Sequence, residues 1–315
     1  MKKILVTGGA GFIGSNLIES LLDREYLVVC LDNLSTGSLS NIQEFVGHKN
    51  FEFIEGDILD FKLVSKLSKD AFAVSHQAAL GSVPRSIKDP LTSNRVNIEG
   101  TLNVYKASVD NNVSRVVYAA SSSTYGDSQE LPKREEKIGK PLSPYAVTKL
   151  VNELYANVFH KVYGLNTIGL RYFNVFGPKQ NPEGPYAAVI PLFIKAILSG
   201  KNPVINGDGS HSRDFTFVNN AVQANIKALE ASINNYNTVY NVACGQRTNL
   251  KELVTYINEV VGADISPMFG KEREGDVQHS LADISKAKSL LGYQPGYPVK
   301  EGLAATVDWY KKQEK

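Results

Sequence analysis

A glycine-rich turn between an apolar run and a helical pattern is the feature that most restricts how this chain can fold. Residues 4–7 are apolar or β-branched, Gly8-Gly9-Ala10-Gly11-Phe12-Ile13-Gly14 follows, and residues 13–22 have helical periodicity. Glycines in such a turn let backbone N–H groups approach a pyrophosphate, and the helix N-terminus adds a partial positive charge. The segment therefore predicts a strand–turn–helix unit that binds a dinucleotide.

The acid after the second apolar run indicates which dinucleotide. Asp32 lies 18 residues beyond Gly14, where a carboxylate can accept hydrogen bonds from the adenosine ribose hydroxyls. A carboxylate there would repel a 2′-phosphate, and Asn33-Leu34-Ser35 offers no arginine to attract one. We therefore predict NAD rather than NADP. Asp57, after the third run, could bind the adenine amino group or simply cap a helix.

Short apolar runs alternate with helical patterns along the first three quarters of the chain. The predicted strands are residues 4–7, 27–31, 51–55, 72–76, 116–120, 167–171 and 239–242. Several are apolar throughout, as expected of parallel strands that are buried on both faces. Helical stretches such as 13–22 and 149–163 lie between them. The alternation predicts an α/β fold, a doubly wound parallel (Rossmann) sheet.

The alternation weakens after residue 176. Residues 177–185 form a loop rich in Pro, Gly and Asn, followed by isolated helical patterns and a short strand at 204–206. We predict a dinucleotide-binding domain over residues 1–176, to which 215–243 return. Residues 177–214 and 244–315 then form a smaller, partly discontinuous α/β domain for the substrate.

The composition argues against several classes of partner. Lys and Arg number 34 against 32 Asp and Glu, so no charge excess favours nucleic acid or an acidic membrane. No apolar stretch reaches the roughly 18 residues that a membrane span needs, so a soluble cytoplasmic protein is expected. Cys30 and Cys244 are far apart, which favours buried free thiols. The five histidines show no ligand spacing, and no metal site is predicted.

Tyr145 and Lys149 lie four residues apart at a predicted helix start and so share a face. A free tyrosine, with a pKa of about 10, is a poor base at neutral pH. A nearby ammonium and an oxidised nicotinamide both favour the phenolate, so the pair predicts a base for a substrate hydroxyl. A chance pairing on a solvated helix face is the ordinary alternative for such spacing.

A run of hydroxyls follows the strand at 116–120. Ser121, Ser122 and Ser123 stand at the carboxyl end of that predicted parallel strand, where α/β proteins bind their ligands. Such hydroxyls can hydrogen-bond a reacting alcohol or its ketone, although a Ser-rich turn can be an ordinary loop. The combination of the glycine turn, the strand-end serines and the Tyr-x-x-x-Lys pair, in this order, is a more specific sign of such an enzyme site than any one of these motifs alone.

Taken together, these motifs resemble the extended short-chain dehydrogenase/reductase family over nearly the whole chain. The matching segments are Thr7 to Gly14, Leu31-Asp32-Asn33-Leu34-Ser35-Thr36-Gly37, Asp57-Ile58, His76-Gln77-Ala78-Ala79, Tyr145 with Lys149, Arg171-Tyr172-Phe173-Asn174-Val175-Phe176-Gly177 and Arg273-Glu274-Gly275-Asp276. Within the family, the loop from Gln77 to Ser86 is similar to that of bacterial epimerases that act on UDP-N-acetylglucosamine (UDP-GlcNAc).

The resemblance implies a role for each motif. Tyr145 is expected to be the base, Lys149 to orient the nicotinamide ribose and lower the tyrosine pKa, and Ser121 to bridge to O4 of a sugar. Ser122 and Ser123 are its neighbours, and the three are not firmly ranked. The residues expected to contact the cofactor are Gly8, Gly11, Phe12, Ile13, Gly14, Asp32, Asn33, Ser35, Thr36, Gly37, Asp57, Ile58, Gln77, Ala78, Ala79, Tyr145, Lys149, Tyr172 and Val175. Those expected to contact a UDP-sugar are Gly81, Ser82, Ser121, Ser122, Ser123, Tyr145, Asn174, Ala188, Val189, Asn206, Arg213, Arg273, Asp276 and Ser280.

The implied activity is 4-epimerisation of a UDP-hexose through a 4-keto intermediate, in a homodimer formed by helices over 91–108 and 149–163. A small residue at Ser280 is expected to leave room for a 2-acetamido group and so to favour UDP-GlcNAc and UDP-GalNAc. Dehydration is disfavoured, because Ser122 and Ser123 occupy the places of the acid pair that dehydratases carry. Two alternatives remain: a UDP-glucuronate epimerase or decarboxylase using Arg85 or Arg247 for the carboxylate, and a non-catalytic NAD-binding regulatory protein.

Overall fold

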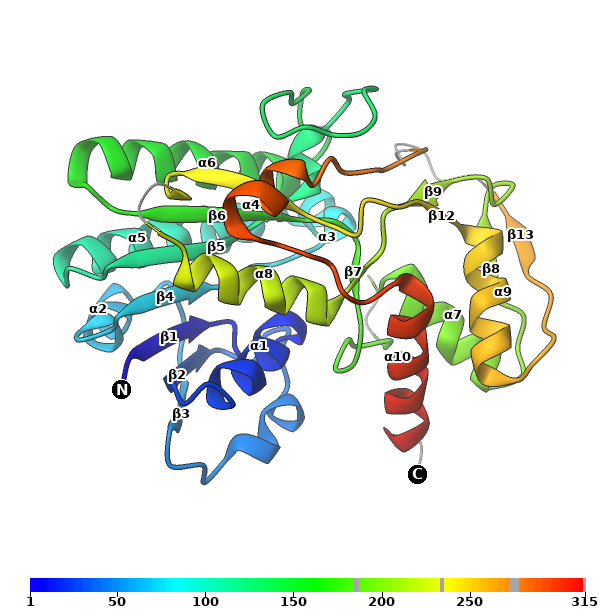
Figure 1. Cartoon of the computed structure of the whole chain (residues 1–315), viewed down its shortest axis with the longest axis horizontal. Coiled ribbons are helices and arrows are strands. Elements are labelled where there is room, and N and C mark those ends of the chain that lie inside the picture. Colours follow the sequence, from blue (N-terminus) through cyan, green and yellow to red (C-terminus); the bar gives the residue numbers. More distant parts are fainter. Residues whose placement is uncertain (184–186, 233–234, 272–277, 314–315) are drawn as a thin grey trace.

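Seven parallel strands form the central sheet of the protein (Figure 1). The computed structural model describes residues 1–183, 187–232, 235–271 and 278–313. In spatial order the strands are β11 (Thr238–Val242), β6 (Thr167–Tyr172), β5 (Arg115–Ser121), β4 (Ala73–His76), β1 (Lys3–Thr7), β2 (Leu27–Asp32) and β3 (Phe51–Glu55). Every predicted strand is confirmed to within one residue at each end, and the predicted doubly wound α/β fold is confirmed.

The strand order reverses between β1 and β4. The chain runs outward from β1 through β2 to β3, then crosses back to β4 and continues outward to β11 on the other side. At such a switch point the connections leave in opposite directions and open a crevice at the carboxyl ends of the strands.

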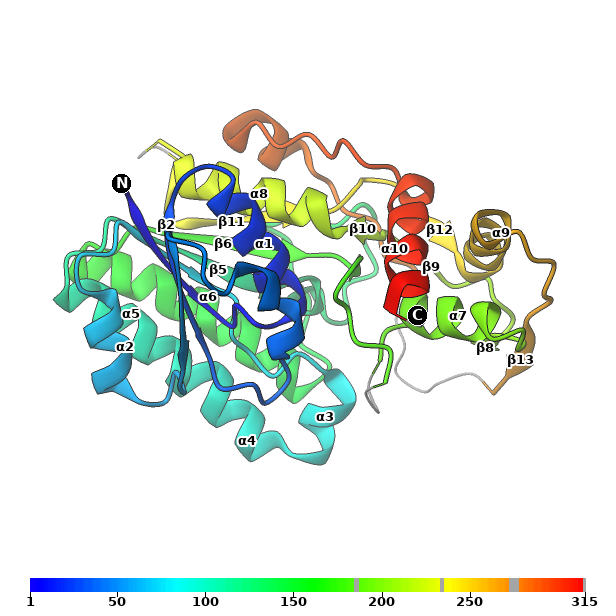
Figure 2. The same cartoon turned by 90° about the horizontal axis from the view of Figure 1, so that it is seen from below.

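Helices cover both faces of the sheet (Figures 1 and 2). One face carries α1 (Phe12–Leu22) and α8 (Val218–Glu230), and the other carries α2 (Phe61–Ser68), α5 (Gly100–Asp110) and α6 (Pro144–Tyr163). Side chains alternate across a strand, so β1 contributes Ile4 and Val6 to the core under α1 and Leu5 to the core under α5. Two buried apolar clusters thus fix the sheet from either side.

Helix α6 begins earlier than the predicted stretch 149–163. The Ser143 hydroxyl caps its first turn by accepting from the Ala146 amide, and Pro144 occupies the first turn, where a missing N–H costs nothing. The helix ends at Gly164 in a left-handed conformation. These caps place Tyr145 and Lys149 in the first two turns.

The helix predicted over 91–108 is divided into three elements. They are α4 (Pro90–Asn94), the π-helical turn η3 (Arg95–Glu99) and α5. The buried Asn97 accounts for the irregularity, because its side chain bonds the Leu80 backbone N–H at 2.8 Å and the Thr148 hydroxyl at 3.1 Å. A π-helical turn aims that amide at the pocket wall and at α6. A short helix, α3 (Val83–Lys88), precedes them in a segment predicted as a loop.

A smaller lobe lies beside the sheet in Figure 1 and consists of short strand pairs and helices. The helices are α7 (Val189–Leu198), α9 (Leu250–Val261) and α10 (Val299–Gln313). The π-helical turn η6 (Ala287–Leu291) precedes α10 in the chain but packs on α8 and β11 of the sheet. The strand pairs are β7 (Val175–Phe176) with β10 (Thr216–Phe217), β9 (Ser212–Arg213) with β12 (Thr248–Asn249), and β8 (Val204–Asn206) with β13 (Met268–Gly270). The core under α1 continues into this lobe through Ile190, Leu253 and Leu303. The domain boundaries remain a prediction, although α8 and β11 do return to the sheet.

Three general features complete the fold. Among the described residues, no helix is long and apolar enough to cross a membrane, and no group of three His, Cys, Asp or Glu side chains could hold a metal ion. Cys30 is buried, Cys244 is partly buried, and both are free thiols. The cytoplasmic location remains a prediction.

Candidate active site

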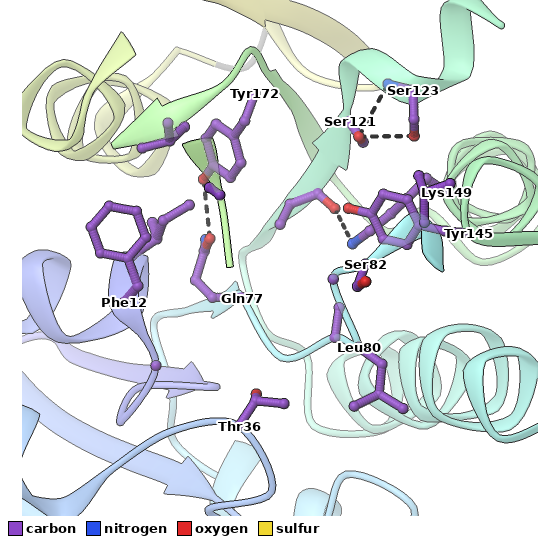
Figure 3. A pocket seen from close by; sticks show the side chains of 18 of the residues that line it. Phe12, Thr36, Gln77, Leu80, Ser82, Ser121, Ser123, Tyr145, Lys149 and Tyr172 are labelled. Carbon is purple, nitrogen blue, oxygen red and sulfur yellow. Dashed lines mark hydrogen bonds between the residues drawn. The ribbon is translucent and has the colours of Figure 1, made fainter. Parts of the chain in front are cut away.

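A pocket runs across the carboxyl ends of β1, β4, β5 and β6 into the smaller lobe (Figure 3). It brings together most of the residues predicted for the two ligands. The predicted residues that line it are Gly8, Gly11, Phe12, Ile13, Gly14, Asp32, Asn33, Ser35, Thr36, Ile58, Gln77, Ala78, Ala79, Gly81, Ser82, Ser121, Ser122, Ser123, Tyr145, Lys149, Tyr172, Asn174, Val175, Ala188, Val189, Arg213 and Ser280.

The glycine turn is closely packed. Gly8 has a φ of +70°, and a Cβ on it would lie 2.5 Å from the Ala78 nitrogen; one on Gly14 would lie 2.2 Å from the Gly8 carbonyl oxygen. Helix α1 starts at Gly11 without a side-chain cap and without an acid in its first turn. Its first N–H groups therefore face a cradle that suits an anion such as pyrophosphate.

Asp32 is held at the edge of this cradle. Its carboxylate accepts from the backbone N–H of Ala10 at 2.9 Å and of Leu34 at 2.8 Å. Burial raises its pKa, and these hydrogen bonds act in the opposite direction. Asp32 lines the pocket beside the glycine turn, as a ribose-binding acid must.

Three predicted site residues do not line the pocket. Asp57 accepts from the Asn33 side-chain amide at 2.8 Å and from the Leu59 N–H at 2.8 Å. It is not a helix cap, since Asp60 caps α2, and its contact with adenine remains a prediction. Gly37 packs against the Ala10 backbone. Asn206 lies on β8, paired with Gly270 of β13. Arg273 and Asp276 lie outside the described residues.

A ring of three side chains closes the pocket wall at the ends of β4 and β6. The Tyr172 hydroxyl donates to Gln77 Oε1 at 3.1 Å, Gln77 Nε2 donates to Asn225 Oδ1 at 2.9 Å, and Asn225 Nδ2 donates to the Tyr172 hydroxyl at 2.7 Å. Figure 3 shows the Tyr172–Gln77 bond on the side of the pocket opposite Tyr145 and Lys149. Tyr172 thus points to the face of the sheet that α8 covers.

Tyr145, Ser121 and Lys149 meet at the other end of the pocket (Figure 3). Ser121 and Tyr145 both line this end, and the Ser121 side chain opposes the upward shift of the Tyr145 pKa. Ser123 donates its hydroxyl to Ser121 Oγ at 2.9 Å and its N–H at 3.1 Å, which orients the Ser121 oxygen. Lys149 Nζ donates to the Ala119 carbonyl at 2.7 Å and lies 5.8 Å from the centre of the Tyr145 ring. The geometry thus singles out Ser121 among the three serines.

The electrostatics of this group correct one expectation. Burial raises the pKa of Tyr145, and the Ser121 side chain opposes it. Burial also lowers the pKa of Lys149 to about 8, against the opposing charge of Glu153. The net shift of the Tyr145 pKa is upward and Lys149 is not among its causes, in contrast to the lowering that the resemblance implies. A phenolate at neutral pH needs a further positive charge, which an oxidised nicotinamide would bring.

The sugar-nucleotide half of the pocket is assembled from distant segments. The Ser280 N–H donates to the Ser212 carbonyl at 3.0 Å, and Arg213 Nη1 donates to the Gln278 carbonyl at 3.0 Å. These bonds join β9 to the segment that carries Ser280, 67 residues later. Asn174, with a φ of +38°, bonds the Asp214 carbonyl next to Arg213. Arg213, Asn174 and Ser280 therefore share one wall.

Several lining residues were missed from the sequence. Lys133 is almost fully buried, donates to the Ser128 carbonyl and lines the pocket. It lies in a polar loop with no motif, and its pairing with Ala282 and a bond from the Asn241 side chain to its carbonyl hold it at the site. Gln180 and Asn181 line the pocket from the Pro/Gly-rich loop. Arg85, named above as a possible carboxylate partner, lines the pocket, whereas Arg247 does not.

Fold and site together are those of a dinucleotide-binding protein whose pocket holds a tyrosine, a lysine and a serine at one end. A model of the NAD dependent epimerase/dehydratase family matches residues 4–243, and the chain belongs to this family. The resemblance to extended short-chain dehydrogenases/reductases and the prediction of NAD are both confirmed.

Three relatives span nearly the whole chain. A putative UDP-glucose 4-epimerase of Methanocaldococcus jannaschii is 38% identical, over 99% of both chains. The structure of UDP-N-acetylglucosamine 4-epimerase from Methanobrevibacter ruminantium M1, in complex with UDP-N-acetylmuramic acid, is 43% identical over 99% of both chains with a TM-score of 0.95. That of UDP-glucuronic acid 4-epimerase from Bacillus cereus, in complex with UDP-glucuronic acid and NAD, is 34% identical over 99% of both with a TM-score of 0.92.

Proposed function

We propose that the protein is a UDP-hexose 4-epimerase that oxidises C4 transiently and prefers UDP-GlcNAc and UDP-GalNAc. The observation that carries the proposal is the group of Ser121, Tyr145 and Lys149, with Lys149 Nζ 5.8 Å from the centre of the Tyr145 ring. It lies in a pocket that also contains the glycine cradle and the Arg213 wall. A reacting hydroxyl and a dinucleotide can thus be bound together.

The chain's own groups account for the proton transfers. NAD, held by the glycine cradle and Asp32, supplies the hydride acceptor and donor. Tyr145 accepts the proton of the 4-hydroxyl and later returns it, while the Ser121 hydroxyl bridges to the same oxygen. Lys149 lies beside the phenol and stabilises its charged form. The 4-keto sugar turns between the two steps, so there is no net oxidation and the cofactor can stay bound.

The hydroxyls of Ser122 and Ser123 support epimerisation over dehydration. Both line the pocket directly after Ser121, and neither can protonate a leaving hydroxyl at neutral pH as a carboxylic acid does. The 4-keto intermediate is therefore expected to be reduced again rather than to lose water.

The preference for acetylated sugars is based on Ser280. This small, partly buried residue lines the pocket, so the wall there has space for a 2-acetamido group. One wall contact discriminates by about 1–3 kcal/mol, so slower action on UDP-Glc and UDP-Gal is expected. The relative from Methanobrevibacter ruminantium, named for UDP-N-acetylglucosamine, supports this choice.

The UDP-glucuronate alternative has one specific observation in its favour. Arg85 lines the pocket, and a guanidinium is a suitable partner for a C6 carboxylate. The relative from Bacillus cereus acts on that substrate, as its name states. The alternative predicts that UDP-glucuronate is the best substrate and that R85M removes that activity selectively.

Incubating the NAD-loaded protein separately with UDP-GlcNAc, UDP-Glc and UDP-GlcA, and separating the products, tests the proposal. We expect C4 epimers from the first two, with UDP-GlcNAc faster, and no epimer when Tyr145 is replaced by Phe. Equal or faster turnover of UDP-Glc would remove the stated preference. Absence of any epimer would favour the non-catalytic NAD-binding alternative.

We also propose that the protein is a homodimer formed through α4 and α6. Exposed apolar side chains recur along the outer face of α6 at Leu154, Val158 and Val162, and Leu91 of neighbouring α4 is 81% exposed. Such a continuous apolar face is typical of an interface. Sedimentation should give twice the monomer mass, and L154K/V158K should give a monomer.

A further inference from the structure

Arg171 is buried directly behind the catalytic groups without lining the pocket. It pairs with Ala120 on β5 on one side and with Asn241 on β11 on the other. Its side chain is 3% exposed and faces α6, whereas that of Tyr172, the next residue, faces α8. A charged group in such a place needs partners on all sides.

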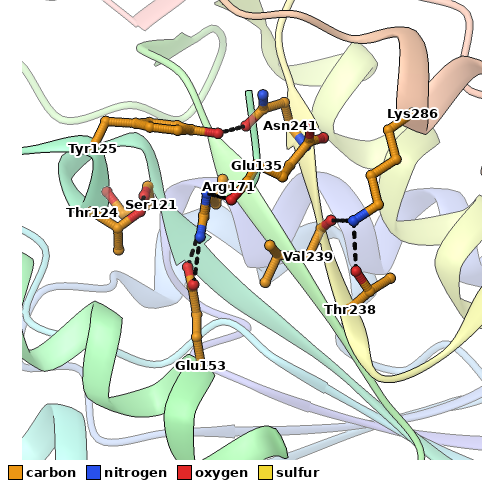
Figure 4. A network of polar contacts seen from close by, with 10 residues as sticks. All are labelled: Ser121, Thr124, Tyr125, Glu135, Glu153, Arg171, Thr238, Val239, Asn241 and Lys286. Carbon is orange, nitrogen blue, oxygen red and sulfur yellow. Dashed lines mark hydrogen bonds and ion pairs between the residues drawn. The ribbon is translucent and has the colours of Figure 1, made fainter. Parts of the chain in front are cut away.

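The guanidinium of Arg171 has three partners (Figure 4). Nε and Nη2 donate to the two carboxylate oxygens of Glu153 at 2.9 and 2.7 Å. Nη1 donates to the Glu135 carbonyl at 3.0 Å. The Tyr125 ring lies against it, with 4.9 Å between the guanidinium carbon and the ring centre. One planar group therefore contacts three separate segments.

Two of these segments carry the catalytic hydroxyls. Glu153 lies on α6, four residues after Lys149 and eight after Tyr145, so the three share one side of the helix. Tyr125 ends the turn η4 (Ser122–Tyr125), which begins directly after Ser121. The Tyr125 hydroxyl donates to Asn241 at 2.6 Å, which fixes the turn at a second point.

Stability alone does not account for this arrangement. Replacing a buried ion pair by apolar side chains of similar volume is often neutral or stabilising, since desolvation cancels the attraction. A bidentate guanidinium–carboxylate pair instead fixes how its two segments are placed, because the planar guanidinium sets both the distance and the angle to the carboxylate. Displacing a catalytic group by about 1 Å can cost a hundredfold in rate.

We propose that Arg171, acting through Glu153 and Tyr125, is a positioning residue that holds α6 against the turn after Ser121. It thereby keeps the Tyr145 and Ser121 side chains at the same end of the pocket. The inference rests on the proposed function of those two hydroxyls.

Glu153 has a second, electrostatic effect that a purely structural residue would lack. Its charge raises the pKa of Lys149, against the effect of burial. The other titratable groups that face Lys149 in the described part of the chain are Tyr145 on the same helix and His76 on β4. Burial lowers the pKa of His76 to about 3, so it is neutral. Removing the Glu153 charge should therefore lower the Lys149 pKa further.

The experiment compares R171M, E153Q and the double variant R171M/E153L with wild type, each purified with its NAD. The control is E259Q, because Glu259 pairs with Lys300 in an exposed bridge between α9 and α10. Wild-type turnover of UDP-GlcNAc tests the proposed function by itself. The rates of the variants relative to wild type test the positioning role.

R171M should lower kcat about tenfold or more, with KM and bound NAD changed less than about twofold. The double variant should melt near wild type and still show the lowered kcat. E153Q should move the alkaline limb of the kcat–pH profile to lower pH, and E259Q should change nothing. If R171M does not fold, the other two variants carry the test. A folded double variant with wild-type kcat, or an E153Q enzyme with an unmoved alkaline limb, would overturn the proposal.

Discussion

Gln77 and Asn225 bond each other side chain to side chain at 2.9 Å, although they lie 148 residues apart in the chain. Tyr172 joins them into a closed ring in which every member both donates and accepts. Cooperative polarisation strengthens each bond of such a ring.

Replacing Asn225 by Leu should destabilise the protein. The substitution leaves Gln77 Nε2 short of an acceptor and the Tyr172 hydroxyl without a donor, which costs about 1–3 kcal/mol. Urea denaturation at pH 7 measures the change. The matched control is N219L, an exposed position on the same helix, and equal midpoints for the two variants would contradict the role of the ring.

Ser121 should matter more than Ser122. Ser121 is the serine whose side chain acts on the Tyr145 pKa, so S121A should lower kcat by about a hundredfold, the usual loss for a proton-transfer or oxyanion partner. S121T, which keeps a hydroxyl, should retain most of the wild-type kcat. S122A should lose less than about tenfold, given only a sugar contact. Initial rates of UDP-GlcNAc epimerisation measure these losses. A larger loss of kcat in S122A than in S121A would contradict the ranking.

Ser280 should control the choice of sugar. A tyrosine in its place would fill the space assigned to the 2-acetamido group. S280Y should therefore lower kcat/KM for UDP-GlcNAc, by a loss of about 1–3 kcal/mol in transition-state binding, while sparing UDP-Glc. Competition between the two substrates in one reaction gives the ratio directly. Full activity of S280Y on the acetylated sugar would remove Ser280 from the specificity argument.

Gly14 should be essential for holding the cofactor. An alanine Cβ would lie 2.2 Å from the Gly8 carbonyl oxygen and 2.7 Å from the Gly9 Cα, both backbone atoms that cannot turn aside. G14A should therefore purify with little bound NAD, measured by absorbance of the denatured supernatant. The control is G296A, where the nearest atom to the new Cβ is 4.0 Å away.

Lys149 should lower the stability of the fold at neutral pH. Its pKa falls from 10.5 to about 8, so between these values the unfolded chain binds the extra proton and stability rises with pH. K149M, stripped of NAD, should therefore be more stable than wild type at pH 7 by on the order of 1–3 kcal/mol. That advantage should shrink as the pH rises from 8 to 10.5. An advantage that does not change with pH would contradict the depressed pKa.

Local signals allowed much of the fold to be predicted from the sequence. The strands are short apolar runs because both of their faces are buried, and that pattern survives in sequence without any knowledge of neighbours. The glycine turn and the Tyr145–Lys149 pair are likewise local, so their place at the strand ends followed from the strand predictions. The helix start at Tyr145 was also predicted, and Ser143-Pro144 provides its cap.

The features that could not be predicted from the sequence depend on contacts between distant segments. Arg171 belongs to a strand motif, but its bonds to Glu153 and Glu135 appear only once the sheet and α6 are packed. Asn97 breaks a helix because it reaches Leu80 and Thr148, and nothing in its own neighbourhood predicts that. Lys133 reaches the pocket through pairing with Ala282, almost 150 residues later.

Two adjacent residues at the end of β6 serve opposite sides of the sheet, the guanidinium of Arg171 toward α6 and the phenol of Tyr172 toward α8. Because side chains alternate along a strand, a register error of one residue would exchange them and dismantle both arrangements together. Molecules with such a register error should accordingly be wholly inactive rather than partly impaired. The activity of a preparation should then report the fraction of chains in which β6 has the correct register.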